Sequence, residues 1–400
     1  MGLTSKERVN RAMRSGYDDA CEPPDQVPTF CQLSIGYYFI NSGLDPFDIW
    51  YRSESFAEAL VGMQQRTGFD GILVNLPGRD PDFEDHVDRL ERGEREDVVW
   101  WKNGNYTRIP HDDNPHYFLA NGDRFFPTFE ELDPETLYYV EPWDLTDVTY
   151  PYTWGFDEEP RPFDSFFDPF HQDTLKSVIK RVGESASVHA EIFSPFAQFL
   201  ELLNFQNGLM AMILDPGKVH ACLERLTLGA TELGKLNAAC GPDALLISDA
   251  FSGGGFISRK HYTDFVLPYE RRVVEAIHAE NPDLPIYTHT CGDIGDRLDL
   301  MLETGIQGVD TLDPPPLGTV ELQDAKDLLK GKAFIKGNMD PVTTLLLGTQ
   351  DDVRNEARRR IAIGKEGGGY ILSTACSVAP LTPPVNVETL AEMTESEGAY

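Results

Sequence analysis

Short apolar runs alternate with longer amphipathic segments along most of this 400-residue chain. The short runs are rich in β-branched and aromatic residues and predict β-strands, whereas apolar residues spaced three or four apart predict helices. Eight strands are predicted, at residues 27–32, 71–75, 187–192, 244–249, 285–291, 308–312, 333–337 and 370–376.

Helical patterns separate most of these strands. Residues 258–280 follow the fourth strand, and Pro268 is expected to kink this helix because proline lacks a main-chain donor. Residues 351–363 follow the seventh strand, with Thr349 as the expected N-cap and Gly364 after the last turn. Eight strand–helix repeats predict a single (β/α)8 TIM barrel over residues 1–400, with an open doubly wound sheet as the alternative.

Residues 77–170 interrupt this alternation and are too many for a simple crossover. Between residues 100 and 156, 15 of 57 residues are aromatic, against 11% in the whole chain. The pair Asn103-Gly104 lies between two apolar runs and predicts a β-hairpin, because Asn-Gly tolerates the positive φ angles of a type I′ turn. We therefore expect an aromatic-rich insertion with its own small sheet near the barrel mouth.

Charge and hydropathy exclude several classes of function. The chain has 34 Lys and Arg against 66 Asp and Glu, a net charge of −32, which would repel phosphate backbones. A nucleic-acid partner is therefore not expected. No apolar stretch of about 18 residues is present, so a membrane protein is not expected either. The chain opens with Thr4 and Glu7 at capping-box spacing rather than with a secretory signal, which predicts a cytoplasmic location.

The six cysteines are too few and too irregularly spaced for a disulfide framework, so free thiols are expected. His289 and Cys291 lie two residues apart at the end of a predicted strand and should share one face. Cys376 ends the last strand, and the strand ends of a barrel converge on one mouth. The three side chains together predict a zinc site. Taken alone, the His-x-Cys pair favours the alternative, a buried cysteine that packs as a small apolar residue, and even with Cys376 the spacing by itself is equally compatible with both interpretations.

Two acidic residues at strand ends are candidates for catalysis. Glu191 follows the third strand and could be a fourth zinc ligand or a proton donor to a leaving oxygen. Asp249 ends the fourth strand and could position a ligand or a base. For Glu191 the alternative is a solvated or salt-bridged carboxylate, and for Asp249 it is a cap of the following turn.

Motifs over most of the chain resemble those of the uroporphyrinogen decarboxylase superfamily, and within it those of the zinc-dependent corrinoid methyltransferases. They are Leu214-Asp215-Pro216 with Lys218-Val219, Leu246-Ile247-Ser248-Asp249, Phe265-Val266-Leu267-Pro268-Tyr269, His289-Thr290-Cys291-Gly292, Gly337-Asn338-Met339-Asp340-Pro341, Ser373-Thr374-Ala375-Cys376 and Thr382-Pro383-Pro384-Val385-Asn386. The zinc ligands of that branch follow the pattern His-x-Cys, long spacer, Cys. The resemblance therefore implies a catalytic zinc held by His289, Cys291 and Cys376, and a corrinoid as the methyl carrier.

The chain departs from the decarboxylase pattern in one respect. Its residues 30–38 contain no arginine where the decarboxylases have an arginine-containing motif that holds the carboxylates of a tetrapyrrole. Decarboxylation of a polyanionic substrate is therefore not expected. No Asp-x-His-x-x-Gly corrinoid-binding motif is present. The resemblance thus implies a corrinoid carried by a separate partner protein.

These observations predict a zinc-dependent methyltransferase that moves a methyl group from a small methylated donor to the Co(I) corrinoid of another protein. An aryl methyl ether is the expected donor, because the aromatic insertion could stack on a flat ring. One alternative is a methylcobalamin:thiol methyltransferase of the coenzyme M type. Another is a module with a structural zinc and no turnover, in which Cys31 would be the remaining strand-end cysteine to close the site.

Overall fold

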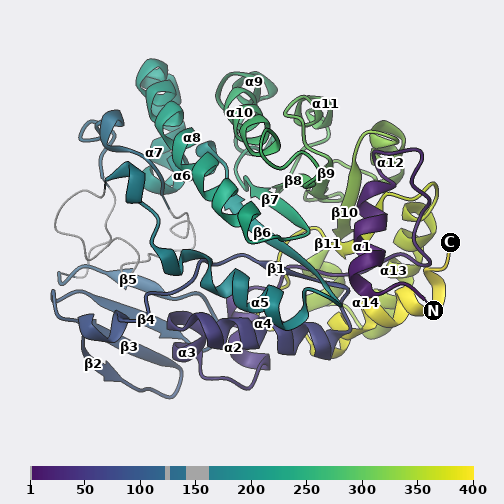
Figure 1. The fold of residues 1–400 in the computed structure, drawn as a ribbon, viewed down its shortest axis with the longest axis horizontal. Coiled ribbons are helices and arrows are strands. Elements are labelled where there is room, and N and C mark those ends of the chain that lie inside the picture. The colour runs from purple at the N-terminus through teal and green to yellow at the C-terminus, as the bar shows by residue number, and fades with distance from the viewer. Residues whose placement is uncertain (1, 122–126, 141–161) are drawn as a thin grey trace.

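Seven parallel strands form one curved sheet, around which the helices pack (Figure 1). The computed structural model describes residues 2–121, 127–140 and 162–400. The strands of this sheet are hydrogen-bonded in the order β1 (Gly71–Val74), β6 (Ser187–Phe193), β7 (Ala244–Ser248), β8 (Ile286–Thr290), β9 (Gly308–Thr311), β10 (Phe334–Met339) and β11 (Tyr370–Thr374). All seven match predicted strands, so the TIM-barrel-like α/β fold is confirmed.

The helices lie outside the sheet and at its two ends (Figure 1). They are α1 (Ser5–Arg14), α2 (Ile35–Asn41), α3 (Pro46–Tyr51), α4 (Ser53–Thr67), α5 (Asp173–Val182), α6 (Pro195–Leu203), α7 (Phe205–Leu214), α8 (Pro216–Ala239), α9 (Arg259–Phe265), α10 (Leu267–His278), α11 (Leu298–Leu302), α12 (Leu322–Leu329), α13 (Gln350–Gly364) and α14 (Pro384–Glu397). Short 3₁₀ segments cover Phe83–His86, Pro134–Thr136, Phe163–Ser165 and Pro169–Gln172, and a π-helical turn covers Pro341–Leu346. No helix in the described ranges has both the length and the apolar character needed to cross a bilayer.

Local sequence signals set several helix ends. Thr4 and Glu7 form the expected capping box of α1, and Thr349 caps α13 in the same way with Asp352. The helix predicted over residues 258–280 is divided at Val266 into α9 and α10, with Pro268 in the first turn of α10. The break follows from the missing N–H of proline, as expected.

The prediction of a regular first strand over residues 27–32 is wrong. This segment makes only isolated bridges, such as the one between Thr29 and Leu372 of β11. Pro28 has no N–H, and the N–H of Thr29 donates to the Asp70 carboxylate instead of to a neighbouring strand. The segment still lies between β11 and β1, because Leu372 N donates to Pro28 O (2.9 Å) and Asp70 N donates to Thr29 O (2.8 Å).

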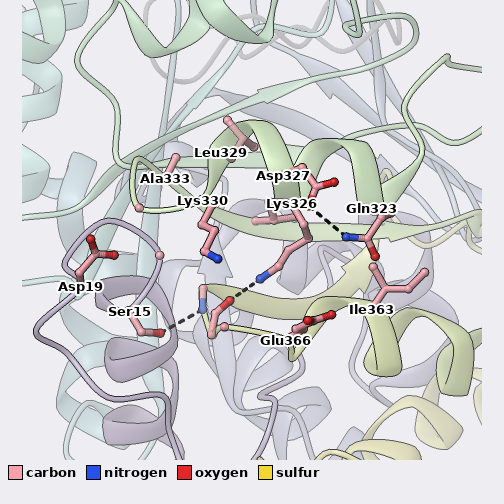
Figure 2. Close-up of a pocket in the computed structure, with 16 residues that line it drawn as sticks. Ser15, Asp19, Gln323, Lys326, Asp327, Leu329, Lys330, Ala333, Ile363 and Glu366 are labelled. Atoms are coloured by element: carbon pink, nitrogen blue, oxygen red, sulfur yellow. Dashed lines mark hydrogen bonds between the residues drawn. The ribbon is translucent and has the colours of Figure 1, made fainter.

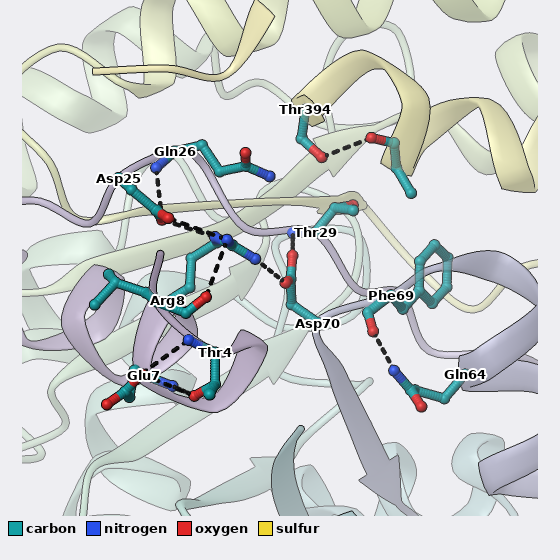
Figure 3. Close-up of polar contacts among 12 residues, drawn as sticks. Thr4, Glu7, Arg8, Asp25, Gln26, Thr29, Gln64, Phe69, Asp70 and Thr394 are labelled. Carbon is teal, nitrogen blue, oxygen red and sulfur yellow. Dashed lines mark hydrogen bonds and ion pairs between the residues drawn. The ribbon is translucent and has the colours of Figure 1, made fainter. Parts of the chain in front are cut away.

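Arg8 of α1 stabilises this seam between the two edges of the sheet (Figure 3). Its guanidinium binds the Asp25 carboxylate through Nε (2.9 Å) and the Asp70 carboxylate through Nη1 (2.8 Å). The second oxygen of Asp70 accepts from Thr29 N at 3.0 Å. Side chains thus supply the links that a regular strand ladder would have made.

The insertion begins and ends at adjacent points, since Gly78 N donates to His171 O at 2.7 Å. It contains a four-stranded antiparallel sheet of β2 (Val87–Glu91), β3 (Glu96–Trp101), β4 (Tyr106–Pro110) and β5 (His116–Phe118), which confirms the predicted hairpin. The prediction of a type I′ turn at Asn103-Gly104 is wrong. Only Gly104 has a positive φ (89°), and its N–H donates to Trp101 O, as in a type I turn with a glycine bulge.

A cavity of about 130 Å³ lies at the amino ends of β10 and β11 (Figure 2). Lys326 and Lys330 reach into it from α12 and its C-cap, and the Lys326 ammonium donates to Gly368 O. Burial lowers the pKa of Lys326 to about 8. In (β/α)8 barrels this end is the one associated with stability, whereas catalytic residues gather at the carboxyl ends of the strands.

Candidate metal centre

His289, Cys291 and Cys376 meet at the carboxyl ends of β8 and β11. The Cys291 sulfur lies 3.3 Å from Nε2 of His289 and 3.6 Å from the Cys376 sulfur. These three residues form the one group in the described ranges whose potential metal-ligand atoms all lie within 4.8 Å of one another. The structure therefore brings together all three predicted ligands, and Cys31 is not part of the group.

The spacing of the three atoms suits a zinc ion. Bond lengths of about 2.0–2.3 Å and tetrahedral angles place neighbouring nitrogen and sulfur ligands about 3.5–3.8 Å apart. The observed separations of 3.3 and 3.6 Å lie within a few tenths of an ångström of these values. Three protein ligands of this kind leave one tetrahedral position for another molecule.

A buried ion pair orients the imidazole. Nδ1 of His289 lies 3.2 Å from Asp310 of β9, and both carboxylate oxygens of Asp310 lie 3.1 Å from Nζ of Lys336 on β10. Burial alone would raise the pKa of Asp310, but the Lys336 charge and the His289 hydrogen bond outweigh it and hold the pKa below its ordinary value. An ionised Asp310 accepts from Nδ1–H, which leaves Nε2 as the ligand atom.

The cluster also alters the protonation of its own members. A hydrogen bond from Cys291, together with His289, holds the pKa of Cys376 well below its usual range, while the Cys291 pKa is raised well above it. Burial opposes a charge on His289, but Asp310 and Cys376 raise the pKa of its imidazole to about 10. A thiolate thus lies beside a proton-bearing imidazole, and metal binding would displace the remaining protons.

Glu191 lies on β6 but outside this group of ligand atoms. It is buried and borders a cavity of about 30 Å³ together with Asn75, His171 and Tyr139. Its charge acts on Tyr287, whose pKa burial and nearby acids raise well above the ordinary value. The structure therefore places Glu191 beside the barrel interior, and the predicted roles of its carboxylate stay predictions.

Asp249 follows β7, and its carboxylate lies in a buried acidic pair with Glu270 of α10. Its carboxylate accepts from the Ser194 hydroxyl (2.6 Å) and from Phe251 N (3.4 Å). Burial raises its pKa to about 6, and burial and the Asp249 charge raise the pKa of Glu270 on α10 well above its usual value. Asp249 is the first residue of the loop at residues 249–256, and these contacts hold its carboxylate in the buried cluster.

That loop packs directly on the metal-ligand segment. A Cβ at Gly253 would lie 2.4 Å from Cys291 O, and Gly254 N donates to Asp293 O at 2.6 Å. Only glycine at position 253 allows this approach of the two main chains. Asp249 can therefore influence Cys291 through the loop, which agrees with the predicted positioning role and leaves it to be tested.

Sequence reasoning missed Asp310, Lys336 and Asp313. Asp310 and Lys336 are single charges inside otherwise apolar strands, and this is the signal by which an internal ion pair could have been found. Asp313 lies just beyond β9 and accepts from Gly292 N at 2.6 Å, next to the Cys291 ligand. Its Oδ1 is buried without a hydrogen-bond partner among the described residues, and burial raises its pKa to about 6.

Comparison with known proteins finds relatives of two kinds. The uroporphyrinogen decarboxylase of Legionella pneumophila (strain Philadelphia 1) is 29% identical over 191 residues, which are 47% of this chain and 51% of that protein. The methylcobamide:CoM methyltransferase of Methanosarcina acetivorans is 28% identical over 220 residues, 55% of this chain and 61% of that protein. The chain thus spans about half the length of the curated decarboxylases it matches.

A solved methyltransferase structure from Methanosarcina mazei superposes with a TM-score of 0.68, at 18% identity, over 98% of this chain and 99% of that one. It shows that the two chains share a fold. The sequence pattern described as uroporphyrinogen decarboxylase (URO-D) matches residues 158–396, which include β6 to β11 and the whole His-Cys-Cys group. Since this match covers more than half of its residues, the chain belongs to the uroporphyrinogen decarboxylase family.

Proposed function

We propose that this chain is a zinc-dependent methyltransferase that moves a methyl group from a small methylated donor, an aryl methyl ether, to the Co(I) corrinoid of a separate protein. The observation that carries the proposal is the convergence of His289, Cys291 and Cys376 on one point at the barrel mouth. Relatives that match this chain include a methylcobamide:CoM methyltransferase, which supports the same class of chemistry.

A zinc ion held by these side chains would supply Lewis acidity toward a donor oxygen, or stabilise a thiolate if a thiol is the substrate. Other residues of the chain position the proposed zinc ligands. Asp310 and Lys336 hold the His289 ring so that Nε2 faces the two sulfurs. The loop containing Gly253 fixes the main chain of Cys291.

Loss of a methyl group from an ether leaves an oxygen that must take up a proton. Glu191 is the proposed donor, as a buried carboxyl beside the barrel interior. Asp313 is a second candidate because its Oδ1 is buried beside the metal-ligand segment and its raised pKa of about 6 increases the fraction of the carboxyl that carries a proton near neutral pH. A carboxyl group with such a pKa can give up its proton near neutral pH.

The insertion supports the choice of an aromatic donor. Asp112, in the turn after β4, lies so close to Gly36 that a Cβ there would come within 2.7 Å of Asp112 O and 2.9 Å of Pro380. Pro380 belongs to the segment that follows Cys376. This contact brings the turn after β4 next to the segment that follows Cys376, which supports the proposed place of the insertion near the barrel mouth.

The direct test mixes the purified zinc-loaded protein with cob(I)alamin, or with a Co(I) corrinoid protein, and a methyl donor. Methoxyaromatics, methanol and methylamines are compared, and the cobalt spectrum is followed. We expect Co(I) to be converted to methyl-Co(III) with a methoxyaromatic compound. A parallel assay starts from methylcobalamin and a thiol, and its conversion to Co(I), with no methylation of Co(I) by any donor, would instead establish the thiol methyltransferase. No change with any donor or thiol would refute methyl transfer.

A further inference from the structure

The cavity of about 130 Å³ at the amino ends of β10 and β11 contains two lysines that the proposed function does not use (Figure 2). Lys326 lies on α12 and Lys330 is the C-cap of that helix, so the two side chains leave the same face one turn apart. The metal centre lies at the opposite ends of these strands. A role of this cavity is thus separate from the reaction proposed for the metal centre.

The Lys326 amine lies in surroundings that disfavour its charge. Its Nζ donates to Gly368 O, a neutral acceptor, and among the described residues it forms no ion pair. Burial lowers the pKa of Lys326 to about 8, with a smaller opposing effect of Glu366 and a further lowering by the like charge of Lys330. At pH 7.5 about a quarter of Lys326 is then a neutral amine, against about a thousandth of an ordinary lysine with a pKa near 10.4.

The loop before β11 forms one wall of the cavity and leaves space beside Lys326. Gly367, Gly368 and Gly369 all have positive φ angles, of 73°, 76° and 69°. Glycine adopts such a run without strain, and a Cβ at Gly368 would lie 2.8 Å from Ser15 Oγ. A single water needs about 10–15 Å³, so a cavity of about 130 Å³ has room for a small acyl group.

We propose that Lys326 is a modification site, at which Nζ is acylated by an acyl phosphate whose phosphate group binds to Lys330. The neutral amine attacks the carbonyl carbon, a C–N bond forms, and the C–O bond to phosphate breaks. Phosphate leaves with the electron pair and takes up the proton that Nζ loses. The products are an amide and hydrogen phosphate. A lysine becomes a nucleophile in this way when burial keeps part of it uncharged.

The charges of the cavity favour this class of reagent. Lys330 forms no ion pair with the described part of the chain, so its ammonium is available to a phosphate group, whereas an uncharged ester offers it nothing to bind. The amide product carries no charge and keeps an N–H for Gly368 O, which suits a buried position. The acidic residues of the lining are ion-paired with neither lysine; they are Asp19, Asp327 and Glu366.

The test compares Lys326 with Lys332, whose Nζ also donates to a main-chain carbonyl, that of Leu328, but is exposed. The intact protein is treated briefly with acetyl phosphate at pH 7.5, and peptide mass spectrometry measures the acetylation of each lysine. We expect Lys326 to react at least about tenfold faster, because more of it is uncharged. Its rate should level off above about pH 8, whereas that of Lys332 should keep rising. In the urea-unfolded chain the two lysines should react equally.

Lys330→Gln tests the binding of the phosphate group, with Lys332→Gln as the control and thermal melting to show that each variant is folded. Lys330→Gln should slow acetylation of Lys326 by acetyl phosphate at least about threefold more than acetylation by the uncharged reagent N-acetylimidazole. Lys332→Gln should leave both rates unchanged.

Equal rates of Lys326 and Lys332 in the folded protein, or a preference for Lys326 that persists in urea, would overturn the modification site. Equal slowing of Lys330→Gln with both reagents would overturn the choice of acyl phosphates. None of these measurements depends on methyl transfer, so the proposed function stands or falls separately.

Discussion

Individual side chains at the barrel mouth have separable roles. His289, Cys291 and Cys376 present ligand atoms toward one point, and Asp310 with Lys336 orients the imidazole from behind. Cys222 and Cys240, by contrast, lie on α8 and at its C-cap, away from any such group among the described residues. Substitution of the proposed zinc ligands can therefore be compared with substitution of cysteines that lie away from the metal centre.

Replacing Cys291 or Cys376 by Ala should remove most of the bound zinc, because two ligands seldom retain the ion. Elemental analysis of purified protein should fall from close to one zinc per chain toward zero, with the circular dichroism spectrum retained. Cys222→Ala and Cys240→Ala are the controls and should keep their zinc. Full zinc retention in both ligand variants would contradict the metal site.

Glu191→Gln should slow methyl transfer at least about tenfold if this carboxyl protonates the leaving oxygen, since general acids typically contribute 10²–10⁴ in rate. The measurement is the single-turnover rate of Co(I) methylation by a methoxyaromatic donor. Asp313→Asn is the comparison, because Asp313 is also buried near the ligands. An unchanged rate for Glu191→Gln alongside a slow Asp313→Asn enzyme would assign the proton to Asp313.

At the scale of elements, a buried pair of acidic residues joins the end of β7 to α10. This pair is not part of the metal group. Asp249 after β7 and Glu270 on α10 interact in a buried site, where Tyr262 OH lies 3.5 Å from Glu270. The raised pKa values mean that the folded protein holds protons that the unfolded chain releases. The stabilisation from this pair is therefore fully present at low pH and is lost as the pH rises through the folded pKa values.

Glu270→Gln should flatten this pH dependence, because the Gln amide mimics a protonated Glu: its NH2 can donate to Asp249 and its oxygen can accept from Tyr262. The variant removes the titration of Glu270 itself, whereas Asp249, whose pKa burial raises to about 6 against an ordinary 3.8, keeps a pH-dependent contribution on the order of 1–3 kcal/mol at about 1.4 kcal/mol per pKa unit. Urea unfolding at pH 5 and pH 8 measures it. Glu275→Gln, an exposed position on α10, is the control. Equal slopes for Glu270→Gln and the unsubstituted protein would show that the pair does not share a proton.

The two tryptophans of β3 face opposite sides of the small sheet. Trp101 is buried, donates from Nε1 to Thr107 and contacts the Tyr51 ring, whereas Trp100 packs on the outer side against Tyr106. Trp101→Ala should thus lower the free energy of unfolding by about 3–5 kcal/mol. If the Trp100 ring stacks on the proposed aryl methyl ether, Trp100→Ala should raise KM for that donor with zinc content and stability nearly unchanged. If Trp100→Ala alters only the melting temperature or the oligomer size, the insertion has a structural role.

At the scale of the whole molecule, closure of the barrel depends on side chains of α1. Arg8→Ala should leave the Asp70 carboxylate buried without its cation and lower the free energy of unfolding by roughly 2–4 kcal/mol. Arg14→Ala removes an exposed i,i+4 pair with Asp18 and should change it by less than about 0.5 kcal/mol. Chemical denaturation of both variants measures the difference. Similar small losses in both would mean that main-chain contacts alone close the seam.

The sequence by itself determined the seven regular strands, the capped ends of α1 and α13, the break at Pro268 and the hairpin at Asn103-Gly104. Each depends on residues within a few positions of one another, so local periodicity and turn chemistry suffice. It also placed His289 and Cys291 on one face, since strand residues two apart point the same way. The approach of Cys376 was predictable only once a barrel was assumed.

Tertiary structure alone decided the rest. Residues 27–32 form isolated bridges and not a regular strand, because Pro28 lacks an N–H and the N–H of Thr29 donates to the carboxylate of Asp70, 41 residues away in the chain. The ion pair behind His289 joins strands 21 and 26 residues apart in the chain, and the Arg8 contact with Asp70 joins residues 62 apart. Such pairs depend on how strands and helices pack in space, and a pattern of apolar and polar positions does not specify which buried charges will meet.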